Sequence, residues 1–545
     1  MSKKITFISD FFIEQGVTGG AEAFNDELVL MLTKKGYTIN KINSENFIPT
    51  LINDETFYIV SNFMKLSEAS KLKLQDRRYI ILEHDHKYVS TNDPSKFKNM
   101  IAPFDKIINK GFFEQAEAVF CQSQIHADVL QKNLLLDTVV NIGCNLWSED
   151  RLAKLEKLLN TSKTRKNGVL FSNNKNKGML YAVQYCDKNN IDFEFIKPSS
   201  YESFILELAK TERIFFFPQW LESFNRVIIE ARILNCKVTS NKLIGATYEP
   251  WFKKYKGKEL LEFLRNQREE ICDKFIRAVE KKQLFFLPPI EPPKISIITS
   301  MFKAGKYISH FMEEVAKQTI FDQCELIIVD ANSPDNEYEI IKRYINKHRN
   351  IVYKRLDSTL SVQETMNIAI KESTGEFLTL WNVDDTRSYN YLEIMSKYLK
   401  VDPGIDLVYS DCYQTTVENQ IVEDNSSNGA IYGHSVYPFS RENMIKCLPG
   451  PMPLWKKSMT EETGLFDEQL KFAGDWDMWL RCVEKGYKFK KVPYAYGLYY
   501  INPDGLSTSS KNNKERFREE RDIFNKYKHV FGEKVYNKFK GYFNG

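Results

Sequence analysis

Residues 377–385 are Phe-Leu-Thr-Leu-Trp-Asn-Val-Asp-Asp, an apolar run that ends in two adjacent carboxylates, Asp384 and Asp385. The run predicts a buried strand, and ligands of open α/β sheets gather beyond the carboxyl ends of the strands. Carboxylate oxygens at such a place suit a hard cation such as Mg²⁺ or Mn²⁺, which keeps positions open for substrate phosphates. The segment therefore predicts chemistry on a diphosphate, with a solvated turn or a helix N-cap as the alternative.

The residues before this segment predict a βαβ unit. Residues 294–300 and 324–330 are short apolar strands, and residues 307–318 between them have helical spacing. The second strand ends at Asp330, and Ser333 lies in the cluster of turn formers that follows. Strands that alternate with helices favour an α/β fold with a parallel sheet.

Residues 293–510 resemble glycosyltransferase family 2. Besides the segments above, the resemblance rests on Asn367, on Gly-Leu-Phe-Asp-Glu at 464–468 and on Asp-Trp-Asp-Met-Trp-Leu-Arg at 475–481. It implies a GT-A-type nucleotide-diphospho-sugar transferase domain that inverts, with Asp475 as the base that deprotonates the acceptor hydroxyl. Capping of that helix is the alternative role for its two aspartates. The donor-binding residues implied are Asp330, Ser333, Asn367 and Asp384.

The resemblance also implies a site for Mn²⁺ or Mg²⁺ formed by Asp384, Asp385 and Asn502. A metal there neutralises the leaving diphosphate. This chain departs from the family pattern, since Ala331 and Asn382 stand where Asp is usual and Asn502 stands where His is common. Because an amide oxygen is a weaker ligand than a carboxylate, we expect a reduced metal affinity.

The amino-terminal half has a different set of motifs. A strand-like run is followed by Gly19 and Gly20, which open an amphipathic run at 24–33. A glycine turn at a helix start lets backbone N–H groups and the helix dipole approach an anionic ligand, although plain turn chemistry is the alternative. Farther along, an apolar strand at 214–218 precedes the segment 219–231, which contains two glutamates.

Residues 3–285 resemble glycosyltransferase family 4. The resemblance rests on Glu222 and Glu230, on the glycine turn and on Asn-Asn-Lys-Asn-Lys-Gly at 173–178. It implies a GT-B-type pair of Rossmann-like lobes and a retaining, metal-independent transfer with Glu222 as a catalytic acid near the donor sugar. Eight residues make little over two helical turns, so both glutamates can address one ligand. The donor-binding residues implied are Gly19, Gly20, Lys177 and Glu230.

Other features of this half favour a non-catalytic role. Asn225 and Asn235 replace glycines that are usual in family 4, and no Arg ahead of Lys177 is placed to share the charge of a diphosphate. Glu222 and Glu230 can also be simple polar positions of an amphipathic helix. A binding or scaffold module that has lost catalysis is therefore the alternative for the amino-terminal half.

A further cluster follows the apolar run 79–82, where His84 and His86 alternate with acidic residues. A metal site, a loop that contacts donor or acceptor in the inter-lobe cleft, and an internally satisfied loop are three interpretations. A zinc site usually needs further ligands at a recognisable spacing, and none follows. The role of these two histidines stays open.

Length and composition fit two modules. A chain of 545 residues is too long to fold around a single hydrophobic core. The proline-rich run at 288–293 predicts an extended linker between two modules. The predicted domains are a GT-B-like module at 1–287, with lobes at about 1–150 and 165–280, and a GT-A-like domain at 294–545. Nine scattered Cys indicate neither a zinc ribbon nor a disulfide framework and favour a reducing compartment.

We find no signal-peptide pattern and no apolar run long enough for a membrane span. The net charge of +4 does not distinguish between classes of binding partner. The expected location is cytoplasmic, with peripheral contact at the inner face of a membrane as a variant, because the basic and aromatic carboxyl-terminal residues suit an anionic surface or nucleic acid. Ordinary solvated helix faces are the alternative for those residues.

The predicted function is transfer of sugars from nucleotide-sugar donors to a glycan, a lipid-linked acceptor or a protein, with both halves active. Glycosylation of modified DNA bases is the rival within enzymes, and it predicts salt-sensitive binding of duplex DNA. The donor sugar, the linkage and the acceptor are not determined by these motifs.

Overall fold

The computed structural model describes residues 4–16, 19–197, 200–291, 294–425 and 431–544. The chain divides into two compact units, Met1–Pro289 and Ile290–Gly545, which we describe separately. Residues 282–291 contain neither helix nor strand, and the last two residues of the predicted linker, Pro292 and Pro293, lie outside the described residues. Within the described part of the chain, no helix combines the length and the apolar character that crossing a bilayer requires.

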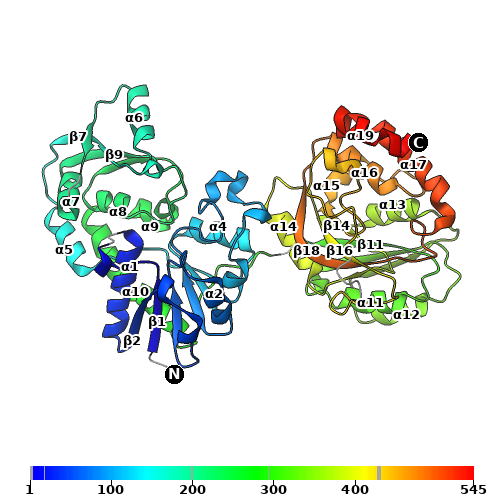
Figure 1. Ribbon diagram of the computed structural model, residues 1–545, viewed down its shortest axis with the longest axis horizontal. Coiled ribbons are helices and arrows are strands. Elements are labelled where there is room, and N and C mark those ends of the chain that lie inside the picture. Colours follow the sequence, from blue (N-terminus) through cyan, green and yellow to red (C-terminus); the bar gives the residue numbers. More distant parts are fainter. Residues whose placement is uncertain (1–3, 17–18, 198–199, 292–293, 426–430, 545) are drawn as a thin grey trace. The chain divides into compact units, whose positions relative to one another are not determined.

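The first lobe of the amino-terminal unit is a six-stranded parallel sheet in the order β2-β1-β3-β4-β5-β6 (Figure 1). Strands β3, β4 and β5 are buried along their whole length, as expected for a parallel sheet covered on both faces. The elements are β1 (Lys4–Ser9), α1 (Gly20–Lys34), β2 (Thr38–Asn43), β3 (Phe57–Val60), α2 (Glu68–Gln75), β4 (Tyr79–Leu82), α3 (Lys110–Glu114), β5 (Ala118–Cys121), α4 (Gln124–Leu134) and β6 (Val139–Asn141).

The second lobe is a four-stranded parallel sheet in the order β10-β9-β7-β8. Its elements, with the helix that leads into it and the one that leaves it, are α5 (Glu149–Lys157), β7 (Arg165–Leu170), α6 (Met179–Lys188), β8 (Glu194–Ile196), α7 (Tyr201–Lys210), β9 (Thr211–Phe216), α8 (Arg226–Ile233), β10 (Lys237–Ser240), α9 (Pro250–Lys254) and α10 (Gly257–Val279).

Helix α10 joins the two lobes. Its Phe275 stacks on Phe120 of β5, with ring centroids 4.5 Å apart, and it also contacts Phe24 of α1. The apolar residues of α10 therefore extend a core that includes residues of both lobes. Two parallel sheets flanked by helices agree with the predicted Rossmann-like lobes.

The carboxyl-terminal unit contains an eight-stranded mixed sheet in the order β13-β12-β11-β14-β17-β16-β18-β15. Figure 1 shows α11 and α12 on one face of this sheet and α13 and α16 on the other. The strands are β11 (Ile295–Met301), β12 (Cys324–Asp330), β13 (Ile351–Arg355), β14 (Phe377–Leu380), β15 (Thr386–Arg387), β16 (Leu407–Thr415), β17 (Leu454–Lys456) and β18 (Phe489–Tyr500). The helices are α11 (Ile308–Ala316), α12 (Tyr338–Ile345), α13 (Val362–Glu372), α14 (Tyr391–Val401), α15 (Lys457–Thr463), α16 (Gly474–Glu484), α17 (Asn513–Lys526), α18 (Lys528–Phe531) and α19 (Glu533–Asn544).

The parallel half of this sheet brings the sequence motifs to one edge. In the ladders, Ile298 of β11 pairs with Leu380 of β14, and Asp330 ends β12 beside Arg355 of β13. The predicted strand 377–385 is shorter than expected, because β14 ends at Leu380. A turn closed by the bond from the Asp385 N–H to the Asn382 carbonyl follows, and this turn carries the two carboxylates.

Candidate active site

The turn after β14 gathers the predicted metal-binding residues. Asn502 donates from Nδ2 to Asp384 Oδ2 at 3.0 Å, and Asn382 donates from Nδ2 to Asp385 Oδ2 at 3.0 Å. The backbone N–H of Tyr500 donates to Asp385 Oδ1 at 3.2 Å. Strand β18 therefore holds Asn502 beside the two aspartates, as the motif order predicted.

Electrostatics at this turn favour a bound cation. Burial raises the pKa of both Asp384 and Asp385, and the neighbouring charge of Asp384 raises that of Asp385 further. No cluster of three or more His, Cys, Asp or Glu among the described residues could hold a metal by itself. The donor set of two carboxylates and amide oxygens fits a hard cation whose remaining ligands come from diphosphate and water.

Arg387 follows this turn in the chain, in β15, and no role was predicted for it from the sequence. It is fully buried between the rings of Trp381 and Tyr391, with its guanidinium carbon 4.4 and 4.6 Å from their centroids. It donates from Nη1 to Thr379 Oγ1 at 2.8 Å and also donates to the Leu380 carbonyl. Its charge lowers the pKa of Asp385, against the larger effects of burial and Asp384.

Asp330 is buried at the end of β12, where strand β13 supplies its partners. Tyr353 Oη and Arg355 Nη1 donate to Asp330 Oδ2 at 2.5 and 2.8 Å, and the Ser333 N–H donates to Oδ1 at 2.7 Å. The Ser333 hydroxyl donates to Glu337 at 2.6 Å. Asp330 and Ser333 thus form one hydrogen-bonded corner, and their contact with a donor stays a prediction.

Asn367, another predicted donor-binding residue, is bonded to the backbone of the loop 464–468. Its Nδ2 donates to the Phe466 carbonyl at 2.9 Å and its Oδ1 accepts from the Phe466 N–H at 3.0 Å. The side chain is buried, and Nδ2 also donates to Glu468. In this structure Asn367 positions the loop 464–468, and a direct donor contact stays a prediction.

Asp475 lines a cavity of about 880 Å³. It lies in the first turn of α16, where Oδ1 accepts from the Trp476 N–H at 2.7 Å and Oδ2 accepts from Cys447 Sγ at 3.5 Å. Burial raises the pKa of Asp475, and no ion pair with it occurs among the described residues. Asn382 lines the same cavity, so the predicted base and the acidic turn share one space.

Its neighbour Asp477 has a structural role. It forms ion pairs with Lys526 and Arg481, both at 2.8 Å, and accepts a hydrogen bond from Tyr527 Oη. Burial would raise its pKa, but these bonds together lower it. Asp477 therefore joins α16 to α17 instead of capping the helix, and the role of Asp475 as the base stays a prediction.

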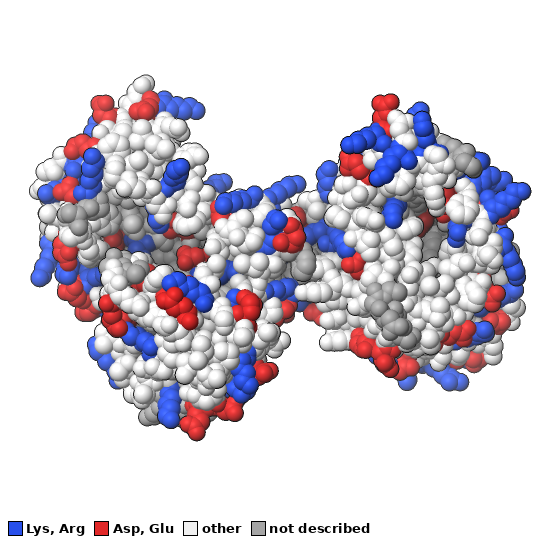
Figure 2. Space-filling view, viewed as in Figure 1, with Lys and Arg blue, Asp and Glu red and all other residues white. Residues whose placement is uncertain are grey.

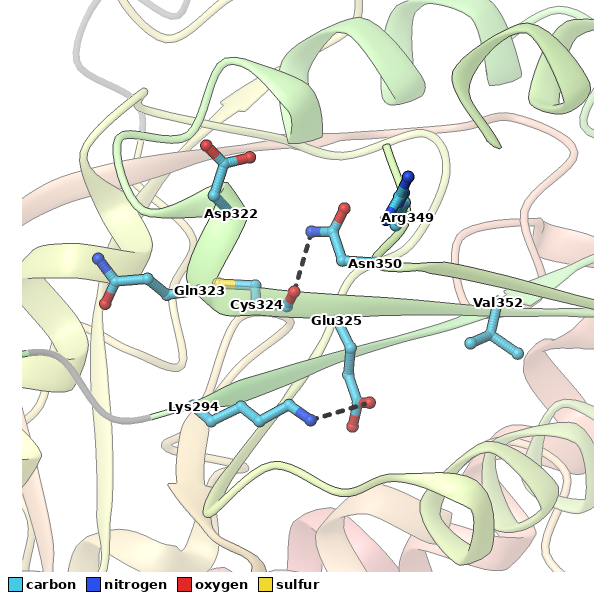
Figure 3. A pocket seen from close by; sticks show the side chains of 8 residues that line it. All are labelled: Lys294, Asp322, Gln323, Cys324, Glu325, Arg349, Asn350 and Val352. Carbon is cyan, nitrogen blue, oxygen red and sulfur yellow. Dashed lines mark hydrogen bonds and ion pairs between the residues drawn. The ribbon is translucent and has the colours of Figure 1, made fainter. Parts of the chain in front are cut away.

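A second hollow lies at the opposite end of the parallel strands (Figure 3). It has a volume of about 490 Å³, and Glu325 and Asn350 line it together with Lys294, which lies 3.7 Å from Glu325. These residues are at the amino ends of the strands, whereas ligands of α/β sheets bind at the carboxyl ends. The cavity beside Asp475 is therefore the candidate active site.

In the amino-terminal unit, the structure brings Lys177 and Glu222 together. Their Nζ and Oε1 atoms are 2.9 Å apart, and Asn225 and Trp220 also donate to the Glu222 carboxylate. Gly178 makes this approach possible, since it has φ +72° and a Cβ there would lie 1.6 Å from the Phe217 carbonyl oxygen.

Glu230 is engaged inside the protein. Its Oε1 accepts from Trp147 Nε1 at 2.9 Å and from Tyr201 Oη at 3.1 Å. Arg226 lies 4.0 Å away and donates to Asn145 Oδ1 at 3.0 Å. Burial lowers the pKa of Arg226 to about 10.

The glycine turn at the start of α1 lies against two charged side chains. A Cβ on Gly19 would meet the Glu22 carboxylate at 2.1 Å, and one on Gly20 would meet the Arg226 side chain at 3.4 Å. Arg226 follows Lys177 in the sequence and was not predicted as a second cation for a diphosphate. The turn is therefore next to an arginine, although that arginine is already bound internally.

His84 and His86 belong to a buried polar network. His84 lies 2.8 Å from Gln122 and 3.2 Å from Asn25, and His86 lies 2.9 Å from Tyr88 Oη. Burial lowers the pKa of His84 to about 3 and that of His86 to about 4, so both are neutral at pH 7. Ser223 of the Glu222 loop also donates to Gln122, at 3.1 Å. The network thus links the histidine loop to the second lobe.

Comparisons with known proteins agree with the carboxyl-terminal motifs. Residues 296–460 match the family model described as glycosyl transferase family 2. An uncharacterized glycosyltransferase of Methanocaldococcus jannaschii is 24% identical over 227 residues, which are 41% of this chain and 77% of that protein. The uncharacterized glycosyltransferase YwdF of Bacillus subtilis is 25% identical over 224 residues, which are 40% of this chain and 78% of that protein.

A solved structure of S. aureus TarS 1-349 in complex with UDP-GlcNAc has a TM-score of 0.37 and 18% identity, over 45% of this chain and 73% of that chain. The family match places a family 2 glycosyltransferase domain in the carboxyl-terminal unit. The protein is accordingly a glycosyltransferase.

Proposed function

We propose that the carboxyl-terminal unit transfers a sugar, with inversion, from a nucleotide diphospho-sugar to a hydroxyl of a glycan, lipid-linked or protein acceptor. The observation that supports this most is the cavity lined by both Asp475 and Asn382, since Asn382 belongs to the turn that carries Asp384 and Asp385. Inversion needs a base on the acceptor side and charge neutralisation on the leaving-group side, and Asp475 and the acidic turn would supply these two functions.

On the donor side, Asp384, Asp385 and Asn502 would hold Mn²⁺ or Mg²⁺. Such a cation, when bound, neutralises the charge that develops on the leaving diphosphate. Rotation of the Asn502 amide would turn its oxygen toward the cation, because Nδ2 now faces Asp384. Asp330, held by Tyr353 and Arg355, would contact the nucleotide base.

On the acceptor side, Asp475 would accept the hydroxyl proton as that oxygen attacks the anomeric carbon. Burial raises its pKa, so the carboxylate is a stronger base than an ordinary aspartate. No cation pairs with it among the described residues, and its free lone pairs can therefore accept a proton. The Cys447 thiol beside it would keep it oriented.

Substitution of Asp475, the proposed general base, tests this proposal. Asp475→Asn should lower transfer by on the order of 10²-fold or more, the usual scale for a positioned general base. Binding of the nucleoside diphosphate should stay near that of the wild type. Asp322→Asn is the matched control, because Asp322 is exposed at the hollow of Figure 3 and should leave transfer unchanged. Equal losses in the two variants would refute the assignment.

A retaining, metal-independent transfer by the amino-terminal unit is the second candidate, supported by the Lys177–Glu222 pair. Lys177 would balance the charge of a leaving diphosphate in place of a metal, and Glu222 would hold a sugar hydroxyl by a charge-assisted hydrogen bond. The internal bonds of Glu230 favour the rival view that this unit is a scaffold.

A further inference from the structure

The cavity beside Asp475 is bounded by the carboxyl-terminal helices. Helices α17 and α19 contribute Arg516, Phe517, Glu520, Phe539, Tyr542 and Phe543 to its lining. These residues lie beyond residue 460, where the match to the family model ends. The wall that they form is therefore a feature of this chain that the family match does not account for.

The rim of this cavity is apolar and exposed to solvent. Of the residues that line it, Tyr542 is 72% exposed, Phe517 is 47% exposed and Ile501 is 39% exposed, and Leu506 in the next turn is also 39% exposed. A group of large apolar side chains that meets water at the entrance of a cavity typically marks an interaction surface. Aromatic rings are well suited to the interface between water and lipid, where one edge stays hydrated.

Cations share the helix faces that carry the two aromatic residues. On α17, Lys514 lies three residues before Phe517 and Arg521 lies four residues after it. On α19, Lys538 lies four residues before Tyr542. Residues three or four positions apart lie on the same face of a helix, so these cations share a face with the aromatic residue of their helix. Figure 2 shows blue side chains along the part of this unit where Figure 1 places α17 and α19, with red ones between them.

Exposed cations outnumber exposed carboxylates in this region. From residue 511 to residue 544 the exposed cations are Lys511, Lys514, Arg518, Arg521, Lys526, Lys528, Lys534, Lys538 and Lys540, and the exposed carboxylates are Glu515, Asp522 and Glu533. Of the other two acidic residues there, Glu519 accepts hydrogen bonds from the backbone N–H groups of the 471–473 loop, and Glu520 lines the cavity. The outer surface of these helices is thus positively charged.

We propose that this rim docks the protein on an anionic membrane surface. Basic residues are attracted to the headgroups of anionic lipids, and the apolar rim residues would enter the boundary between headgroups and acyl chains. Ile501 and Leu506 favour a membrane over nucleic acid, because aliphatic side chains gain more from burial at the acyl-chain boundary than from contact with a phosphate backbone. If the proposed transfer is correct, docking would present the hydroxyl of a lipid-linked acceptor to Asp475.

Vesicle flotation of the full chain tests the docking without any need for activity. The wild type should float with vesicles that contain phosphatidylglycerol and stay behind with pure phosphatidylcholine, and added salt should release it. Lys534→Glu combined with Lys538→Glu should weaken flotation about tenfold or more. Neither residue lines the cavity, so donor turnover with a water-soluble acceptor should stay unchanged.

Lys342→Glu combined with Arg343→Glu, on the exposed side of α12, is the matched control and should float like the wild type. Phe517→Ala combined with Tyr542→Ala should also weaken flotation, and the loss should persist at high salt. Equal flotation with neutral vesicles, equal loss in the control, or no flotation at all would overturn the docking proposal while leaving the transfer reaction untouched. A salt-sensitive shift of duplex DNA without flotation would also overturn it, in favour of nucleic acid.

Discussion

The two units differ in whether their proposed functional carboxylates have a cationic partner. In the carboxyl-terminal unit, Asp475 and Asp384 have no lysine or arginine partner among the described residues, and burial raises both pKa values. In the amino-terminal unit, Glu222 pairs with Lys177, and Glu230 accepts internal hydrogen bonds beside Arg226. A carboxylate without a cation can take a proton or bind a metal, whereas a paired carboxylate is already neutralised.

This contrast separates two ways of handling a diphosphate. The carboxyl-terminal unit would need a divalent cation to balance both the acidic turn and the leaving group. The amino-terminal unit has its own cation in Lys177, so it would need no metal.

Loss of the acidic turn should have the largest effect. Asp384→Ala should abolish metal-dependent transfer, because one of the two carboxylates that balance the cation is missing. The Mn²⁺-dependent part of nucleoside diphosphate binding, measured by calorimetry, should disappear, and the melting temperature should not fall. Transfer that persists in this variant, or in wild type with excess chelator, would remove the metal from the mechanism.

Removal of the internal cation should have a smaller effect, confined to the amino-terminal unit. In an Asp384→Ala background with chelator, Lys177→Ala should weaken binding of a nucleoside diphosphate by about 1.5–3 kcal/mol, the range for hydrogen bonds to charged groups. Lys175→Ala is the control, because Lys175 is exposed in the same short turn. If calorimetry finds no nucleotide binding in this background, the scaffold function applies to residues 1–287.

The smallest expected effect is on stability and concerns the proposed base. A folded-state pKa above the unfolded value means that folding favours the protonated form of Asp475, so its ionisation destabilises the protein as the pH rises through that pKa. Asp475→Asn should therefore raise the melting temperature at pH 7 by on the order of 2 °C. The gain should shrink as the pH falls, because the wild-type residue then becomes neutral as well.

A matched variant in the other unit sharpens this measurement. Glu222→Gln removes one partner of the Lys177 ion pair, so it should not raise the melting temperature at pH 7. A stabilisation of both variants, or of neither, would show that the carboxylates of the two units do not differ in the proposed way.

Much of the carboxyl-terminal site follows from local sequence. An apolar strand followed by acidic or amide residues places these side chains at the carboxyl edge of a parallel sheet wherever the strand lies. Asp330, Asp384 and Asp385 were therefore expected at one edge, and the structure has them there. The end of β14 was predicted less well, because the turn at Asn382 depends on side-chain bonds to Asp385 and on the neighbouring strand β18.

The residues that sequence reasoning did not single out act through distant partners. Arg387 is held between two rings, Cys447 lies 28 positions before Asp475, and Arg226 reaches the glycine turn of another lobe. No periodicity or short motif records such contacts, since each depends on elements far apart in the chain. The glycine turn was visible in the sequence, but its arginine neighbour was not.

The sequence by itself determined the α/β class and the order of the acidic motifs, because strand periodicity and turn chemistry are local properties. The two Rossmann-like lobes were implied by the family resemblance, and the mixed character of the third sheet came from the structure. Only the tertiary structure decided which carboxylates stay without a cation. Burial and the approach of charges across the fold set each pKa, so Asp475 and Asp477, two residues apart on one helix, acquire opposite shifts.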